Sequence, residues 1–349
     1  MCTMKRLTLV PGALSALALA AAGVCVSTAA MAAGELNLYT TREPRLIEPM
    51  LEAFEKDKGI KVNTVFVKDG LLERAKAEGA NSPADVFMVV DIGNLLDLVD
   101  AGVTQPIESE TLTTVLPANL RSANNDWFSL SLRDRVLYAD KDLQIDNFTY
   151  EDLADPKWKG KVCIRAGQHP YNTALIAAMI AHDGAEATEK WLQGVKANQA
   201  RKATGGDRDV ARDILGGICD IGIANNYYVG HMKNAEAGSD NRKWGDAIQV
   251  IRPTFAKSGG THVNITGASV AKNAPNKDNA VALLEYLVSQ PAQELYANAN
   301  YEYPIREGVK LNPVTESFGV LKVDPLPLTE IAKYRKQASE LVDKVGFDN

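Results

Sequence analysis

The sequence predicts an α/β protein of two lobes joined by crossing strands, and three observations carry that prediction. Strands alternate with helices over residues 34–102, and a second alternating unit begins at residue 159. Strand-rich segments at about 127–141 and 249–271 lie between the units and are expected to cross from lobe to lobe. Such alternation indicates a mostly parallel sheet with helices on both faces. A chain of this length also usually divides into two cores.

The first unit follows from its periodicity. Residues 34–40 alternate leucine with polar residues, as a strand does. The apolar residues of 44–58 recur on one helical face, and Gly59 ends that helix. The pattern then predicts, in order, a strand at 60–67, a helix at 71–79, a buried strand at 82–91 and a helix at 92–102.

The second unit repeats this logic with more helix. It predicts strands at 159–167 and 219–224, and helices at 171–184, 184–198, 209–217 and within 275–298. The crossing segments divide the chain into two expected lobes. The N-lobe comprises 33–132 plus about 261–310, and the C-lobe comprises about 133–260 plus 311–349.

Residues 1–32 are interpreted as a secretory signal peptide. A charged start precedes an apolar stretch, and Ala30-Met31-Ala32 is an A-x-A cleavage signal, so a mature chain is expected to begin at Ala33. No later stretch is apolar over the roughly 18 residues that a membrane span needs. A soluble, exported protein is expected, and a formal net charge of −6 argues against nucleic-acid binding.

Two cysteines, Cys163 and Cys219, belong to the mature chain. Both lie in strand-like runs, and an even count in an oxidising compartment permits one disulfide. Two buried thiols are the alternative.

Tyrosines recur where predicted strands end. Tyr171 follows the strand 159–167, and Tyr227 and Tyr228 follow the strand 219–224 in a stretch expected to be a loop. Ligands of open α/β sheets bind outside the carboxyl ends of the strands, so these side chains are candidates for a shared site. His231, three residues after the pair, is expected to face solvent.

The chemistry of phenol limits what such a site could hold. A phenol has a pKa near 10 and loses its proton at neutral pH only beside a strong positive charge. A phenolate is a hard anionic oxygen donor that suits Fe(III), whereas softer metals prefer thiolates and imidazoles. The alternatives are aromatic packing or stacking on an organic ligand.

Three charged residues accompany the tyrosines. Arg42 lies in the loop after the strand 34–40, at a helix N-terminus that already favours anions. Arg133 lies on a crossing strand that is expected to line the cleft. Together the arginines could bind an anion that completes a metal's coordination, and Glu43 could ligate the metal or cap its own helix. Surface ion pairing is the simpler interpretation of each arginine alone.

Several segments resemble the periplasmic ferric-iron-binding proteins of bacterial ABC transporters. They include YTTREPRLIEPMLEAFEKDKGIKV (39–62), WFSLSLRDRVLY (127–138), WKGKVCIRAGQHPYNTAL (158–175) and GICDIGIANNYYVG (217–230). The resemblance spans essentially the whole mature chain. It implies a two-lobe solute-binding fold of type II with transferrin-like lobes and crossing strands as a hinge, in a periplasmic monomer that serves a permease and an ATPase at the inner membrane.

The resemblance also implies the site. Tyr171, Tyr227 and Tyr228 become iron ligands, and Arg133 holds a synergistic anion, often carbonate, with help from Arg42. Some relatives carry His-Tyr where this chain has Glu43-Pro44. Three phenolates plus an anion are therefore expected, with Glu43 as a further candidate ligand, while Tyr39 is expected to pack or to support the site from behind.

Two other classes remain as alternatives. A binding protein of the same fold could take an organic cation or an oxyanion, such as a polyamine, thiamine or sulfate. An exported enzyme is disfavoured, because the sequence has no G-x-S-x-G elbow, no zinc motif and no signature carboxylate pair.

Overall fold

The computed structural model describes residues 34–349. The signal peptide predicted for residues 1–32 lies outside the described residues. Within 34–349, none of the helices combines the length and the apolar character required to span a membrane.

Nine strands form the sheet. They are β1 (Glu35–Thr40), β2 (Lys61–Phe66), β3 (Val86–Val89), β4 (Thr104–Gln105), β5 (Phe128–Asp140), β6 (Val162–Cys163), β7 (Ile221–Asn225), β8 (Ile248–Ile251) and β9 (Val263–Ala271). Their order is β2-β1-β3-β9-β5-β7-β6, with β4 on β9 and β8 on β5.

The sheet is mixed, so the prediction of a mostly parallel sheet is wrong for its centre. β1 pairs in parallel with β2 and β3, and β6 pairs in parallel with β7, as βαβ units require. β9 runs antiparallel to β3 and β5, and β5 runs antiparallel to β7 and β8. The two central strands belong to the crossing segments, and antiparallel pairing needs no crossover helix.

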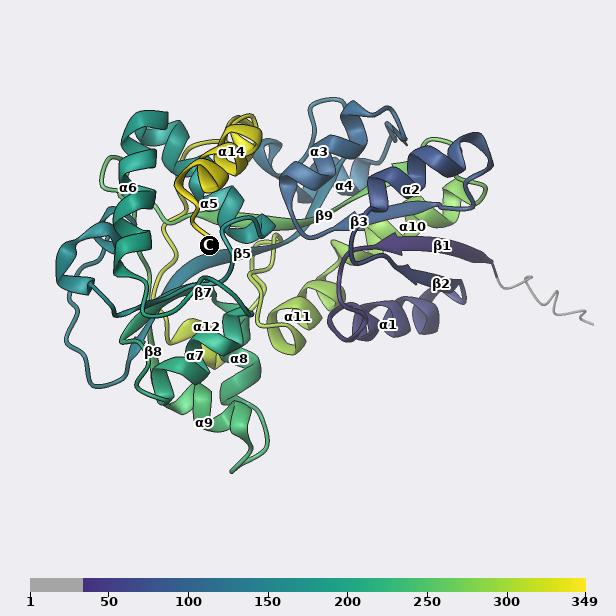
Figure 1. The fold of residues 1–349 in the computed structure, drawn as a ribbon. Coiled ribbons are helices and arrows are strands. Elements are labelled where there is room, and N and C mark those ends of the chain that lie inside the picture. Colours follow the sequence, from purple (N-terminus) through teal and green to yellow (C-terminus); the bar gives the residue numbers. More distant parts are fainter. Residues whose placement is uncertain (1–33) are drawn as a thin grey trace, which may run out of the picture. The chain divides into compact units, whose positions relative to one another are not determined.

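The long strand β5 joins the two halves of the sheet (Figure 1). Its residues 128–134 pair with β9, whereas residues 135–140 pair with β7 and β8. The prediction of a crossing strand at 127–141 is therefore confirmed. Because side chains alternate along a strand, Arg133 and Arg135 share one face and Asp134 points to the other.

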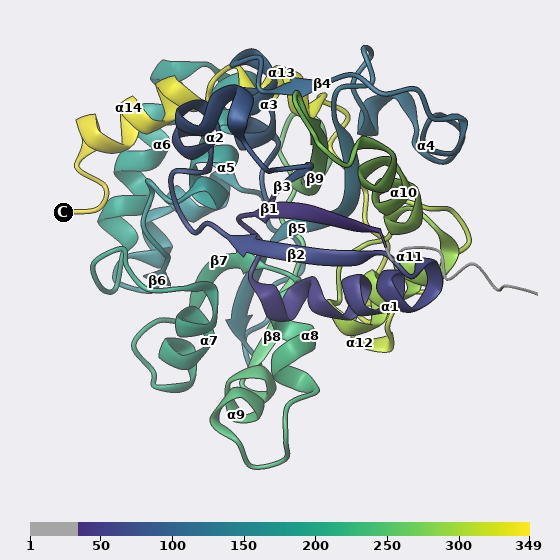
Figure 2. The same cartoon turned by 90° about the vertical axis from the view of Figure 1, so that its right-hand side faces the viewer.

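The helices cover both faces of the sheet. They are α1 (Glu48–Lys58), α2 (Leu71–Glu78), α3 (Ile92–Asp100), α4 (Glu110–Val115), α5 (Pro170–Asp183), α6 (Ala185–Asn198), α7 (Asp207–Leu215), α8 (Tyr227–Lys233), α9 (Asp240–Asp246), α10 (Lys277–Leu287), α11 (Gln290–Ala299), α12 (Pro313–Glu316), α13 (Leu328–Ala332) and α14 (Arg335–Val345). In Figure 2, α1 lies on one side of the β1–β2 pair, and α2 and α3 lie on the other.

Burial follows the predicted alternation. Leu36 and Leu38 of β1 pack in one apolar cluster with Phe54 of α1, whereas Tyr39 belongs to the cluster on the other face. In the second half, Tyr138 of β5 packs in a cluster with Val210 of α7. The chain thus has the two-domain α/β architecture that the sequence predicts; the lobe boundaries stated above stay a prediction.

Two local predictions are wrong at their ends. β6 stops at Cys163, because the following carbonyl groups of Arg165 and Ala166 accept hydrogen bonds from Asn172 rather than from a strand. The stretch expected to be a loop at 225–228 instead ends β7 and begins α8 at Tyr227.

Candidate metal centre

A cleft of about 840 Å³ lies beside the carboxyl ends of the strands. One side, the first wall, comprises lining residues from the segments 41–46, 66–73 and 89–98. The opposite side, the second wall, comprises Arg165, His169, Pro170, Tyr171, Tyr227 and Tyr228. The rule that ligand sites form outside strand ends therefore selects the loops that line this cleft.

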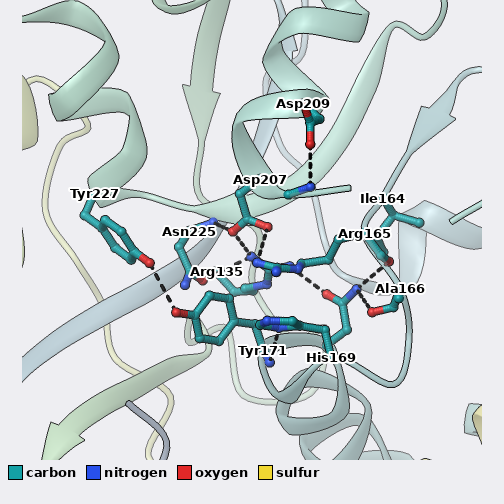
Figure 3. Close-up of polar contacts among 12 residues, drawn as sticks. Arg135, Ile164, Arg165, Ala166, His169, Tyr171, Asp207, Asp209, Asn225 and Tyr227 are labelled. Atoms are coloured by element: carbon teal, nitrogen blue, oxygen red, sulfur yellow. Dashed lines mark hydrogen bonds and ion pairs between the residues drawn. The ribbon is translucent and has the colours of Figure 1, made fainter. Parts of the chain in front are cut away.

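The three predicted tyrosines meet on the second wall. Tyr171 is the second residue of α5, where the His169 side chain accepts a hydrogen bond from its backbone N–H and starts the helix. The Tyr171 and Tyr227 hydroxyl oxygens lie 3.3 Å apart, with the two side chains pointing toward one another (Figure 3). The ring centroids of Tyr227 and Tyr228 are 4.2 Å apart. Residues 56 positions apart thus present phenols to one place.

Guanidinium groups surround these rings. Measured from each guanidinium carbon to a ring centroid, Arg133, Arg135 and Arg165 lie 5.4, 5.7 and 5.0 Å from Tyr171, Arg42 lies 5.5 Å from Tyr227, and Arg208 lies 5.3 Å from Tyr228. Nearby positive charge favours the phenolate over the phenol. The site is therefore built to accept negative charge on its tyrosines.

Without a metal ion, the buried phenols hold their protons. Burial is the main cause that raises the pKa of Tyr227 well above its ordinary value, with Tyr171 and Tyr228 adding to the rise and Arg42 and Arg133 opposing it. Burial likewise raises the pKa of Tyr228. A cation that binds these oxygens must displace protons, so acid should compete with it.

Arg133 is buried without a counter-charge. Its Nη1 donates to Thr266 Oγ1 at 3.3 Å, whereas its Nε and Nη2 have no hydrogen-bond partner within residues 34–349. It lines a cavity of about 10 Å³ that also adjoins Tyr171, Asn225 and His262. The expectation that its strand lines the cleft is met only indirectly, through Tyr171, which borders both spaces.

Arg42 lines the cleft but already has a partner. Its guanidinium forms a buried ion pair with Glu302, whose other carboxylate oxygen accepts from Ser131 Oγ at 2.6 Å. Glu43 also lines the cleft, half-exposed, and pairs with Arg45 at 2.8 Å. The positive charge of Arg42 is thus balanced, and Glu43 is free to turn between solvent and cleft.

Other predicted residues lie outside the cleft. Tyr39 is buried and its hydroxyl donates to Glu78 at 3.1 Å, on the α2 side of the sheet. His231 is half-buried with its ring 5.0 Å from that of Tyr301, so the expectation that it faces solvent is wrong. Its position in α8 turns it back toward the chain.

The structure joins Cys163 and Cys219 by a disulfide. Cys163 pairs with Gly222 across β6 and β7, so the bond ties together the two strands that lead to the tyrosines. The cysteines are buried in the same apolar cluster as Val210.

Sequence reasoning missed the residues behind the tyrosines. Asp207 lies fully buried between Arg135 and Arg165, and Arg208 follows it at the start of α7. Arg135 had a signal, because it lies two residues from Arg133 on a predicted strand and therefore on the same face. Asp207 had none, since its partners are distant in sequence.

This fold and cleft define a bacterial extracellular solute-binding protein. Residues 39–294 match the family of that description, and the chain belongs to it.

Similar proteins are named for iron. The chain is 39% identical to iron uptake protein A1 of Synechocystis, over 90% of this chain and 87% of that protein. A solved Bordetella ferric binding protein shares 78% identity, with a TM-score of 0.83 over 90% of this chain and all of that one. A Trichodesmium protein solved in complex with iron and citrate ligands shares 42% identity, with a TM-score of 0.83 over 90% and 100% of the two chains. The resemblance to ferric-iron-binding proteins is confirmed.

Proposed function

We propose that the protein binds Fe(III) in its cleft through the phenolates of Tyr171, Tyr227 and Tyr228 and delivers it to an ABC transporter. The observation that carries the proposal is the gathering of these phenols on one wall, with two hydroxyl oxygens 3.3 Å apart. Hard, anionic oxygen donors suit Fe(III). The iron-related names of the relatives support the same cargo.

Charge balance supports a second ligand. Three phenolates neutralise one Fe(III), and a carbonate or similar anion would add negative charge next to the surrounding guanidinium groups. Arg133 supplies the clearest place, because its free Nε and Nη2 form the edge that binds two oxygen atoms at once. Since Tyr171 borders both the cleft and the Arg133 cavity, this anion would lie next to the metal.

Arg42 and Glu43 take lesser parts in the proposal. The Arg42 pair with Glu302 limits it to long-range attraction for the anion, although its own Nε has no hydrogen-bond partner within the described chain. Glu43 is placed to add an oxygen ligand once it leaves Arg45.

The setting of the proposed function is the periplasm. The predicted signal peptide at 1–32 and the extracellular character of the family both support export. The protein would act as a monomeric carrier that catalyses no reaction. Its partners would be a permease and an ATPase at the inner membrane.

The test is a visible spectrum of the mature protein titrated with ferric citrate and bicarbonate. Fe(III)–phenolate coordination gives a red to orange charge-transfer band, which should saturate near one equivalent. Tyr227→Phe and Tyr228→Phe should abolish or strongly weaken the band and lower iron affinity by more than about 100-fold, because even residues behind metal ligands cost 10–100-fold.

Tyr39→Phe is the matched control, since it removes a buried phenol outside the cleft and should leave the band unchanged. A wild-type protein with no band, under conditions where a known ferric binder shows one, would overturn the iron proposal. A polyamine, thiamine or sulfate ligand would then be sought by calorimetry.

A further inference from the structure

One buried carboxylate gathers the segments that carry the tyrosines. Asp207 Oδ2 accepts hydrogen bonds from Arg135 Nη1 at 2.6 Å and from the backbone N–H of Asn225 at 2.8 Å. Its Oδ1 accepts from Arg165 Nη1 at 3.1 Å. Asp207 is also the first residue of α7. The start of α7, β5, the end of β7 and the loop after β6 therefore meet at a single side chain (Figure 3).

The guanidinium of Arg135 extends this junction. Besides Asp207, its Nη1 donates to Asn225 Oδ1 at 3.1 Å, and its Nη2 donates to Asn172 Oδ1 at 2.6 Å. The Asn172 amide in turn donates to the carbonyl groups of Arg165 and Ala166, at 2.9 and 3.1 Å. Reaching three partners at once requires the planar fork of arginine, which a lysine ammonium lacks.

Each tyrosine lies beside a member of this network. Tyr171 directly follows Pro170 and precedes Asn172, while Tyr227 lies two residues after Asn225. The residue after Asp207, Arg208, holds its guanidinium 5.3 Å from the centroid of Tyr228. The network thus contacts the backbone or the neighbour of every proposed ligand without being a ligand itself.

We infer that Arg135 and Asp207 form a positioning pair that holds the three tyrosines at one mutual geometry for a single ion. The inference rests on the proposed ferric site and names what orients its ligands. A buried ion pair adds little net stability, since the loss of hydration offsets its attraction. Its contribution here is geometric, as for groups that orient metal ligands from behind, whose loss costs about 10–100-fold in affinity.

The chain contains a matched pair without this role. Arg201 pairs with Asp213 on the same helix α7, and the Arg201 Nη1 donates to the carbonyl groups of Lys202 and Thr204. Asp213 is buried like Asp207. Neither member contacts a proposed ligand, so Arg201→Lys controls for the loss of a guanidinium fork in this half of the protein.

The experiment compares Arg135→Lys with Arg201→Lys in the mature protein. Lysine keeps the positive charge near Tyr171 and removes the fork, so the variant separates position from charge. Arg135→Lys should weaken Fe(III) binding by about 10–100-fold in citrate competition and shift or weaken the charge-transfer band. Arg201→Lys should leave affinity and band at wild-type values, even if both variants lower the melting temperature equally.

The outcomes separate the two proposals. A wild-type protein without a charge-transfer band overturns the ferric site itself. A wild-type band together with an unaltered band and affinity in Arg135→Lys overturns only the positioning pair. If Arg135→Lys does not fold, Asn172→Ala serves instead, because it cuts only the link to Tyr171; a wild-type band in that variant would likewise overturn the inference.

Discussion

The two walls of the cleft differ in the chemistry that they offer. The second wall presents Tyr171, Tyr227 and Tyr228, backed by buried guanidinium groups in excess of carboxylates. The first wall presents charged side chains of both signs, among them Arg42 and Glu43, but no tyrosine. The difference indicates that an ion could bind the second wall through all three phenols, and that the first wall adjusts charge and access.

Burial explains why the walls can differ so strongly. Excess buried positive charge is costly unless an anion or a phenolate lies beside it. On the second wall, Arg133 has no carboxylate within ion-pair distance in the described chain, and a metal-bound phenolate or an anion would supply the missing charge. On the first wall, Glu302 already neutralises Arg42. Only the second wall gains strongly from loading.

The largest effect is expected from removal of that unbalanced charge. Arg133→Gln should weaken ferric binding by about 10–100-fold and abolish its dependence on bicarbonate, because the free Nε–Nη2 edge that would hold the anion is lost. Affinity would be measured by citrate competition with and without bicarbonate.

Thermal unfolding of the metal-free variant is the control. Because a buried unpaired charge is removed, its melting temperature should equal or exceed that of the wild type. A bicarbonate dependence equal to that of the wild type would assign the anion to another group.

An intermediate effect is expected from acid, which acts on the same side. Burial, with Arg135, Arg133 and His182 adding, lowers the pKa of His262 to about 3. The unfolded chain binds the proton near pH 6.5, so it holds more protons than the folded chain between these values. Stability should therefore fall as pH drops below about 6.5, by up to about 1.4 kcal/mol per pH unit.

His262→Gln should reduce that slope. Urea unfolding of metal-free protein between neutral pH and about pH 5 measures it in both proteins. Equal slopes would show that protonation of His262 does not limit the acid stability of this region.

The smallest effect is expected on the first wall. Glu43→Gln removes a half-exposed carboxylate that pairs with Arg45, so ferric affinity should change by less than about threefold, as exposed pairs contribute about 0–1 kcal/mol. A loss of tenfold or more, with a shifted charge-transfer band, would instead make Glu43 a ligand and the two walls equal partners.

Much of the architecture could be predicted from local pattern. The alternation at 34–40 and the helical periodicity of 44–58 record which faces are buried, and the structure places β1 and α1 there. The rule for strand ends then brought Tyr171, Tyr227 and Tyr228 together without any contact being known. The end of β6 could not be predicted, because Asn172 takes the carbonyl groups that would have continued the strand.

By itself, the sequence determined the alternating elements, the crossing strand β5 and the loops that carry the phenols, because periodicity is a local record of burial. The tertiary structure alone decided the partners of the charges. Arg42 meets Glu302 across 260 positions, and Arg135 meets Asp207 across 72. An arginine is compatible with any carboxylate in the chain, so only the packed fold selects which one it meets and which guanidinium, that of Arg133, is left for an anion.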